Sequence, residues 1–184
     1  MPLTKIQSLG ITDGTIVNAD INASAAIAGT KLTGVGKVLQ VVSSFKSDTA
    51  STSSTSYVDT GVTVNITPSS ASNKVLILTD AKFGHSTGNL RFIALFKNGS
   101  IISTGDTDGA RPKTGIVLTD GNGNEKIEAF CTTFLDSPAT TSAITYAIYY
   151  KVYVSGTIYL NKTGNHDTFD GIAGSSIVAI EIAG

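Results

Sequence analysis

Two acidic loops contain the residue types that bind hard cations. Asp106-Thr-Asp108-Gly109 and Asp120-Gly-Asn122-Gly-Asn124 place oxygen ligands at alternate positions, as calcium loops do. The second loop departs from that motif, because Glu125 replaces the glycine after the third ligand and Cys131 replaces the bidentate glutamate. Hairpin turns rich in Asp, Asn and Gly are the simpler interpretation. We therefore predict no bound metal and no cofactor.

Nucleophilic catalysis has few candidate residues in this chain. His85 and His166 both lie in polar, glycine-rich stretches, and there is no G-x-S-x-G nucleophile elbow, phosphate-binding loop or dinucleotide motif. Cys131 follows Phe130 in an expected strand, where we expect it to be a small buried hydrophobic residue. A metal site made by His166-Asp167 of several copies is an alternative to a solvated loop. We predict no catalytic residues and expect the protein not to be an enzyme.

Binding residues on a rigid β scaffold usually lie on its loops. The expected loops are Phe83–Asn89, Gly105–Lys113 and Lys162–Asp170, and each has an inert connector as its alternative interpretation. The chain has no Trp, which argues against carbohydrate binding. The candidate receptor-contacting residues on these loops are His85, Asp106, Asp108, Arg111, His166 and Phe169.

The elements that position these loops are predicted to be β-strands. Residues 37 to 184 have apolar and β-branched runs about ten residues apart, separated by turn residues. Asn98-Gly99 is a strong hairpin signal, and Ile144–Val154 is the longest alternating run. This pattern is typical of an all-β fold, an antiparallel β-sandwich or jelly roll of about ten strands. The expected strands are Lys37–Phe45, Tyr57–Asp59, Val62–Ile66, Lys74–Thr79, Arg91–Lys97, Ser100–Ser103, Ile116–Leu118, Glu125–Leu135, Ile144–Val154, Thr157–Asn161 and Ser176–Ile182.

Two tyrosines lie on the expected outer face of the alternating run. Tyr149 and Tyr153 occupy positions where a solvated antiparallel strand is normally polar. Tyrosine is enriched at protein interfaces, so one interpretation is contact with a neighbouring subunit. The other is that both residues lie beneath a surface loop of their own chain, and the sequence leaves the two open.

The first 36 residues follow a different pattern. Their large apolar residues recur at intervals of five or six, which matches neither a helix nor a strand. So small a repeat cannot form its own core and needs neighbours, most simply the same segment of other copies; an unstructured leader is the alternative. We expect residues 1–36 to be an extended attachment and trimerisation segment with little regular structure, and residues 37–184 to be a separate knob domain. The expected contact residues are Ile6, Ile11, Ile16, Ile21, Ile27 and Leu32.

Composition and charge exclude several classes of partner. Charged residues make up 15% of the 184-residue chain, hydrophobic residues 41%, and the formal net charge is −1. Arg91 and Arg111 are the only arginines and no basic cluster is present, so we expect no nucleic-acid partner. One cysteine excludes an intrachain disulfide framework. Neither a signal peptide nor a membrane-spanning run is expected. Low charge beside a normal apolar fraction favours association of the chain with itself.

Several blocks of the sequence resemble phage virion proteins, in particular the C-terminal domains of tail-fibre and structural proteins common in marine phages. The blocks are GKVLQVV at 36–42, TSYVDTGVTVNITPSSASNKVLI at 55–77, LDSPATTSAITY at 135–146 and the final SSIVAIEIAG. DGTIVNADINASAAIAGTKL at 13–32 is similar to leader repeats of phage fibre and appendage proteins. The match covers most of residues 36–184 and depends on the order of several blocks rather than on one motif.

This resemblance implies a non-enzymatic homotrimer on the exterior of a virion, made in the host cytoplasm. Residues 1–36 would attach it to another virion protein of the tail, the portal-proximal region or the capsid, and the knob would contact a host-cell receptor. The chain has almost no shaft, unlike most such fibres, which favours a short tail fibre or appendage, with a capsid-decorating cement or head-fibre trimer as the alternative. A glycan-binding lectin or carbohydrate-active enzyme is the second alternative. No membrane insertion is expected.

Overall fold

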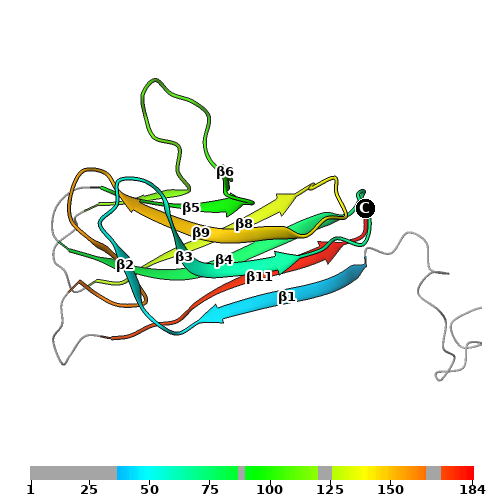
Figure 1. Ribbon diagram of the computed structural model, residues 1–184, viewed down its shortest axis with the longest axis horizontal. Helices are drawn as coiled ribbons and strands as arrows, with labels where there is room; N and C mark the ends of the chain where they lie inside the picture. The colour runs from blue at the N-terminus through cyan, green and yellow to red at the C-terminus, as the bar shows by residue number, and fades with distance from the viewer. Residues whose placement is uncertain (1–36, 87–89, 120–125, 165–170) are drawn as a thin grey trace, which may run out of the picture. The chain divides into compact units, whose positions relative to one another are not determined.

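A computed structural model describes residues 37–86, 90–119, 126–164 and 171–184 of the chain. These residues form eleven strands in two antiparallel sheets and no helix, so the prediction of an all-β antiparallel sandwich is confirmed (Figure 1). Within the same residues, no helix has the length and apolar character of a membrane span. The strands are β1 (Val38–Lys46), β2 (Ala50–Thr52), β3 (Val58–Ile66), β4 (Lys74–His85), β5 (Arg91–Lys97), β6 (Ser100–Ile102), β7 (Ile116–Leu118), β8 (Glu128–Asp136), β9 (Ile144–Val152), β10 (Ile158–Leu160) and β11 (Ser175–Ile182).

The first sheet, sheet A, is built around the long strand β4. One edge of β4 pairs with β8, and the other pairs first with β11 and then with β10. Strand β1 pairs with β11 at one margin of the sheet, and β2 pairs with β10. The N-terminal strand therefore lies beside the C-terminal strand, and the backbone N–H of Ala183 donates to the carbonyl of Lys37 at 2.9 Å.

The second sheet, sheet B, has the order β3-β9-β5, with β6 and β7 sharing the far edge of β5. Asn98 and Gly99 join β5 to β6 with φ angles of 48° and 77°. Consecutive positive φ values are those of a type I′ hairpin turn, which Asn-Gly favours. The hairpin predicted at this dipeptide is confirmed.

The core lies between the inner faces of the two sheets. Strand β9 buries every second residue, as its alternation predicts, from Ile144 through Tyr146, Ile148 and Tyr150 to Val152. Val154 was expected to continue this face but is exposed, because the strand ends at Val152. From sheet A, the alternate residues of β4 and β11 complete the core, for example Ile77 and Ile177.

A buried carboxylate ties β1 to the end of β11. Glu181 is 1% exposed and accepts hydrogen bonds from Gln40 Nε2 at 2.6 Å, Asn73 Nδ2 at 2.5 Å, and the backbone N–H and hydroxyl of Ser69 at 2.7 and 2.8 Å. Burial alone would raise the pKa of this carboxyl, but these donors favour its charged form and lower the pKa to about 2. Glu181 is therefore a structural anchor of the β1 margin of sheet A.

Three elements differ from those expected. Strand β4 continues beyond Thr79 to His85, because Ala81 and Phe83 keep the alternation and bury completely. Strand β3 is continuous where two strands were expected, with a register shift between Asp59 and Thr63. Strand β2 forms in a stretch expected to be a polar surface segment, and pairs through its backbone with β10.

Candidate functional site

An aromatic cluster covers the outer face of sheet B. The Tyr149 ring stacks on Phe96 at a centroid distance of 4.1 Å, and Tyr57 meets the same Phe96 edge-on at 5.1 Å. The Lys151 ammonium lies 4.7 Å from the centroid of Tyr57 and 5.3 Å from that of Phe92. Such contacts stabilise a folded chain by about 0.5–1.5 kcal/mol for each aromatic pair. Tyr149 is thus packed and half-buried by side chains of its own sheet.

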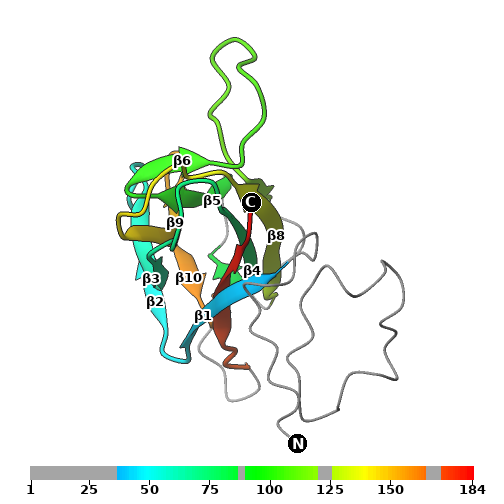
Figure 2. The ribbon, with the colours of Figure 1, turned by 90° about the vertical axis from the view of Figure 1, so that its right-hand side faces the viewer.

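The segment between β6 and β7 rises beyond this face of the sheet (Figures 1 and 2). The part of this segment that leads into β7 is held in place by hydrogen bonds at two points. The Thr114 hydroxyl and the Gly115 backbone N–H both donate to the Ile93 carbonyl at 3.0 Å, and the Tyr57 hydroxyl donates to the Lys113 carbonyl at 3.1 Å. The base of the loop is therefore fixed to β5, whereas residues 105–113 are exposed.

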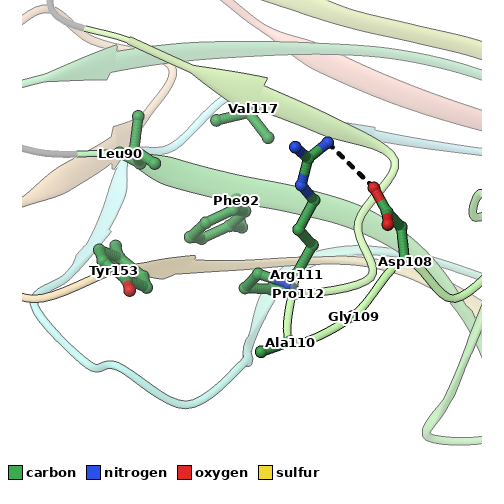
Figure 3. A pocket seen from close by; sticks show the side chains of 9 residues that line it. All are labelled: Leu90, Phe92, Asp108, Gly109, Ala110, Arg111, Pro112, Val117 and Tyr153. Carbon is green, nitrogen blue, oxygen red and sulfur yellow. Dashed lines mark ion pairs between the residues drawn. The ribbon is translucent and has the colours of Figure 1, made fainter.

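A pocket of about 700 Å³ lies where this loop faces the sheet (Figure 3). Its floor is apolar and combines the exposed Leu90, Val117 and Tyr153 with the buried Phe92. Phe92 and Tyr153 meet edge to face with their centroids 5.9 Å apart. Tyr153 is 53% exposed, so it is accessible to a ligand. The loop contributes Asp108, Gly109, Ala110, Arg111 and Pro112.

The polar rim of the pocket is an ion pair. Arg111 Nη1 lies 3.2 Å from Asp108 Oδ2, and the Arg111 backbone N–H donates to the Asp108 carbonyl at 3.2 Å. Gly109 between them has a φ of 57°, a conformation that glycine adopts without strain. Both charged side chains are exposed, so the pair contributes little to stability and keeps hydrogen-bonding capacity for another molecule.

The outer face of sheet A differs in kind, because it is apolar across four strands. Val41 of β1 pairs with Ile180 of β11, which pairs with Leu76 of β4, which pairs with Leu135 of β8. These four residues form one lateral row, and the next row contains Val178 beside Leu78. No described segment covers the face: among its residues, Val41, Phe45, Leu78 and Leu135 are exposed. We call this surface, made by Val41, Phe45, Leu76, Leu78, Leu135, Val178 and Ile180, the apolar face.

Charged residues on the outer side of sheet A lie toward the two ends of β4. The outward-pointing charged residues of β1, β11, β4 and β8 are Lys74, Asp80 and Lys82. Asp80 and Lys82 form an ion pair with each other. The remaining outward positions at the centre of the sheet are apolar, Ser or Thr, which is unusual for a solvated sheet face.

The structure brings together three residues that were predicted for two different kinds of site. Asp108 and Arg111, expected on a receptor loop, meet Tyr153, expected at a subunit contact, around the one pocket of Figure 3. Asp106 lies exposed on the same loop without lining the pocket. Leu90, Phe92 and Val117, which complete the floor, were not anticipated.

Two sequence predictions are wrong. His85 is not on an exposed loop: it ends β4, is buried, and places Nε2 3.8 Å from the Glu128 carboxylate. Cys131 is exposed rather than buried, because it alternates with the inward-facing Phe130 on β8. Its thiol lies 3.4 Å from Asp80 Oδ1. Partial desolvation by neighbouring atoms, together with that carboxylate, raises the pKa of the thiol.

The other predicted site residues lie outside the described part of the chain. These are the six periodic apolar residues of the first 36, the loop residues His166 and Phe169, and the second acidic loop, Asp120 to Asn124. Within the described residues, no three His, Cys, Asp or Glu side chains gather in a way that could hold a metal ion.

Comparison with known proteins adds no relative from which a role could be transferred. No protein-family model matches the chain, and no curated protein matches it at a significant level. The function of the chain is therefore inferred from the pocket, the apolar face and the sequence pattern.

Proposed function

We propose that this protein is a non-enzymatic structural component of a phage virion, a homotrimer attached by residues 1–36 and carrying a β-sandwich knob. The observation that supports the proposal most directly is the apolar face of sheet A. The threefold symmetry and the virion come from the resemblance of the sequence blocks. The apolar face gives that proposal a physical reason.

An apolar sheet face of this extent is costly to leave in water. Large contiguous apolar patches on a protein surface mark interaction sites. Burying apolar surface is worth roughly 25 cal/mol per Å², so even partial coverage of seven large side chains contributes several kcal/mol to association. The same residues on an isolated, permanently monomeric chain would invite aggregation.

A second and third copy are the partners that fit this face best. The 36 residues with periodic isoleucines end directly before β1, and β1 contributes Val41 and Phe45 to the face. Gathering several copies through that segment would hold their knobs close together, which favours contact between their apolar faces. Because the face carries little charge, two identical copies of it can approach without electrostatic repulsion. Closed cyclic assemblies are the usual form of homo-oligomers.

A tail appendage that contacts a host is favoured over capsid decoration by the pocket on sheet B. A protein that only reinforces a shell has no use for an exposed pocket on its far side, whereas an attachment protein needs one. Location on the particle separates the two roles. Antibody carrying gold particles should label the tail of intact virions, and label distributed over the head would establish the decorating alternative instead.

Sedimentation of the full chain tests the trimer. We expect a species of three times 18.9 kDa. Leu135→Asp should weaken its association by roughly 30-fold or more, the equivalent of about 2 kcal/mol, because it buries a charge in the apolar face. Tyr153→Asp is the matched control, since Leu135 and Tyr153 have similar exposure, 49% and 53%, on opposite sheets. A monomer at all concentrations, or equal effects of both variants, would contradict the proposal.

Attachment to the particle is tested separately with the leader. Ile16→Asp places a charge in the middle of the periodic apolar residues and should release the appendage from purified virions. Virions that carry the variant at normal copy number would show that the leader is not the attachment segment, whatever the oligomeric state of the knob.

A further inference from the structure

We propose that the pocket between the β6–β7 loop and sheet B binds a neutral saccharide. Tyr153 would stack on the sugar ring, and the Arg111–Asp108 pair would hydrogen-bond its hydroxyls. No other observation assigns a ligand to this pocket, and three features of it point to this class of ligand.

The first feature is the floor. One face of a pyranose ring presents mainly C–H groups, which pack against the electron-rich face of an aromatic ring. Tyr153 supplies an exposed aromatic ring, held in place by its T-shaped contact with Phe92 and by its backbone N–H, which donates to the Leu90 carbonyl at 2.9 Å. Leu90 and Val117 extend the apolar surface around the ring. Tyrosine can therefore do here what the missing tryptophan would do elsewhere.

The second feature is the rim, where a cation and an anion are already paired. The Arg111 guanidinium has N–H donors beyond the one directed at Asp108, and the Asp108 carboxylate has acceptor sites left over. Adjacent sugar hydroxyls each donate and accept, so they match both groups at once. An anionic ligand would meet the Asp108 charge, and a purely apolar ligand would desolvate the pair without replacing its hydrogen bonds.

The third feature is the size of the site and the way its base is anchored. A volume of about 700 Å³ falls within the range of small-ligand sites, about 300–1,000 Å³. The bonds of Thr114 and Gly115 to Ile93 fix the loop beside the floor before any ligand arrives. Pro112 and the turn at Gly109 restrict the rim further. Less ordering is then required on binding, which favours affinity for a small ligand.

The pocket and the apolar face lie on opposite sheets, so one does not obstruct the other. Saccharide binding by the pocket does not require the trimer, and the trimer does not require the saccharide. In the proposed appendage, saccharide binding by this pocket would supply contact with the host surface. A Leu135→Asp variant that no longer associates should still bind the sugar with unchanged affinity per chain, so the failure of one proposal is distinguishable from the failure of the other.

The experiment screens the full-length protein against an array of neutral oligosaccharides of glucose, galactose, mannose and N-acetylhexosamines. Uronic-acid oligosaccharides form a second arm, and short peptides form a third. Hits are measured by calorimetry. We expect binding in the neutral arm, with at least a tenfold loss for Tyr153→Ala and for Arg111→Ala. Arg111 is exposed on a loop, so its replacement leaves the fold intact, which thermal melting checks.

Two control variants separate a binding role from a general one. Tyr153→Phe keeps the aromatic face and should retain binding within a factor of about three. Tyr159→Ala removes a tyrosine on β10, away from the pocket, whose ring centroid lies 5.0 Å from the Lys162 ammonium, and should have no effect. The proposal is overturned if no neutral saccharide binds, if only the acidic or peptide arm gives hits, or if Tyr153→Ala binds as tightly as the original chain.

Discussion

The outer faces of both sheets carry large apolar side chains, but the two faces differ in how these side chains are covered. On sheet B, the aromatic residues Phe92 and Phe96 are almost fully buried by side chains of the same chain, namely Tyr57, Tyr149 and Tyr153 with Lys151 beside them. On sheet A, Val41, Phe45 and Leu135 are exposed, and no described segment lies over them. The apolar surface of sheet B is thus covered by side chains of the same chain, whereas that of sheet A is left open by the described residues. This difference is the reason for proposing ligand binding on sheet B and association on sheet A.

The comparison predicts opposite responses to removing a phenylalanine from each face. Phe96→Ala should lower the free energy of unfolding by about 3 kcal/mol, because Phe96 is 7% exposed and loses the stacking of Tyr149 and the edge contact of Tyr57. Chemical denaturation at a chain concentration too low for association measures this value.

Phe45→Ala is the matched change on the apolar face. Phe45 is 70% exposed, so the unfolding free energy of the single chain should change by no more than about 0.5 kcal/mol. Its association should nevertheless weaken. Equal destabilisation by the two substitutions would mean that both faces are covered within one chain, and the contrast between them would disappear.

The sheet that carries the apolar face also contains an acid-sensitive anchor. The pKa of Glu181 is lowered from its ordinary value of 4.5 to about 2 in the folded protein. The stability that this carboxylate contributes is therefore fully present above about pH 4.5 and is lost as the pH falls toward about 2. Because Gln40 and Ser69 bond to this carboxylate, acid should loosen the β1 margin of sheet A before it affects sheet B.

Glu181→Gln tests the anchor. The substitution keeps the shape but replaces a charged acceptor by an amide whose NH₂ faces other donors, so the protein should be less stable at neutral pH. The loss of stability between pH 4.5 and 2 should become shallower than in the original chain. Hydrogen exchange of β1 and β3 amides, measured as a function of pH, shows whether the loosening starts on sheet A. Parallel loss in both sheets would contradict the assignment.

Local patterns in the sequence were enough to predict most of the strands, because alternation is a property of neighbouring residues. The alternating run predicted at Ile144–Val154 formed a strand as far as Val152, and the Asn98-Gly99 turn formed as expected. The two errors could have been avoided with the same rule. Extending the alternation of β4 through Phe83 would have carried the strand to His85, and the inward-facing Phe130 requires its neighbour Cys131 to point outward.

The apolar face and the pocket could not be predicted from such patterns, because both are made by the pairing of segments that are distant in the sequence. Leu76 and Leu78 look like core residues until β8 and β11 are placed beside β4, with Leu135 and Ile180 on the same outer side. The pocket likewise exists only because β9 pairs with β5, which brings Tyr153 to the loop that carries Arg111. A single sequence shows the residues of a surface but not which strands will be neighbours.

The smallest expected effect uses Cys131 as a reporter of the apolar face. It lies on the outer side of β8, where it pairs with Asp80, and is the only cysteine in the chain. If copies associate through this face, maleimide should label the thiol several-fold more slowly at a concentration where the trimer forms than after dilution to single chains. The reaction is measured at one pH, because the raised pKa of the thiol makes its rate depend on pH.

Dilution is preferable to substitution in this measurement. Dilution changes the extent of association without changing any residue of the chain, so a difference in labelling rate reports access to the thiol alone. Labelling of the unfolded chain in denaturant gives the rate for a fully accessible thiol at each concentration. A rate that does not vary with dilution, in a protein whose sedimentation does, would show that the copies meet away from Cys131. The contact would then have to lie toward β1, around Val41 and Phe45, rather than across the whole width of sheet A.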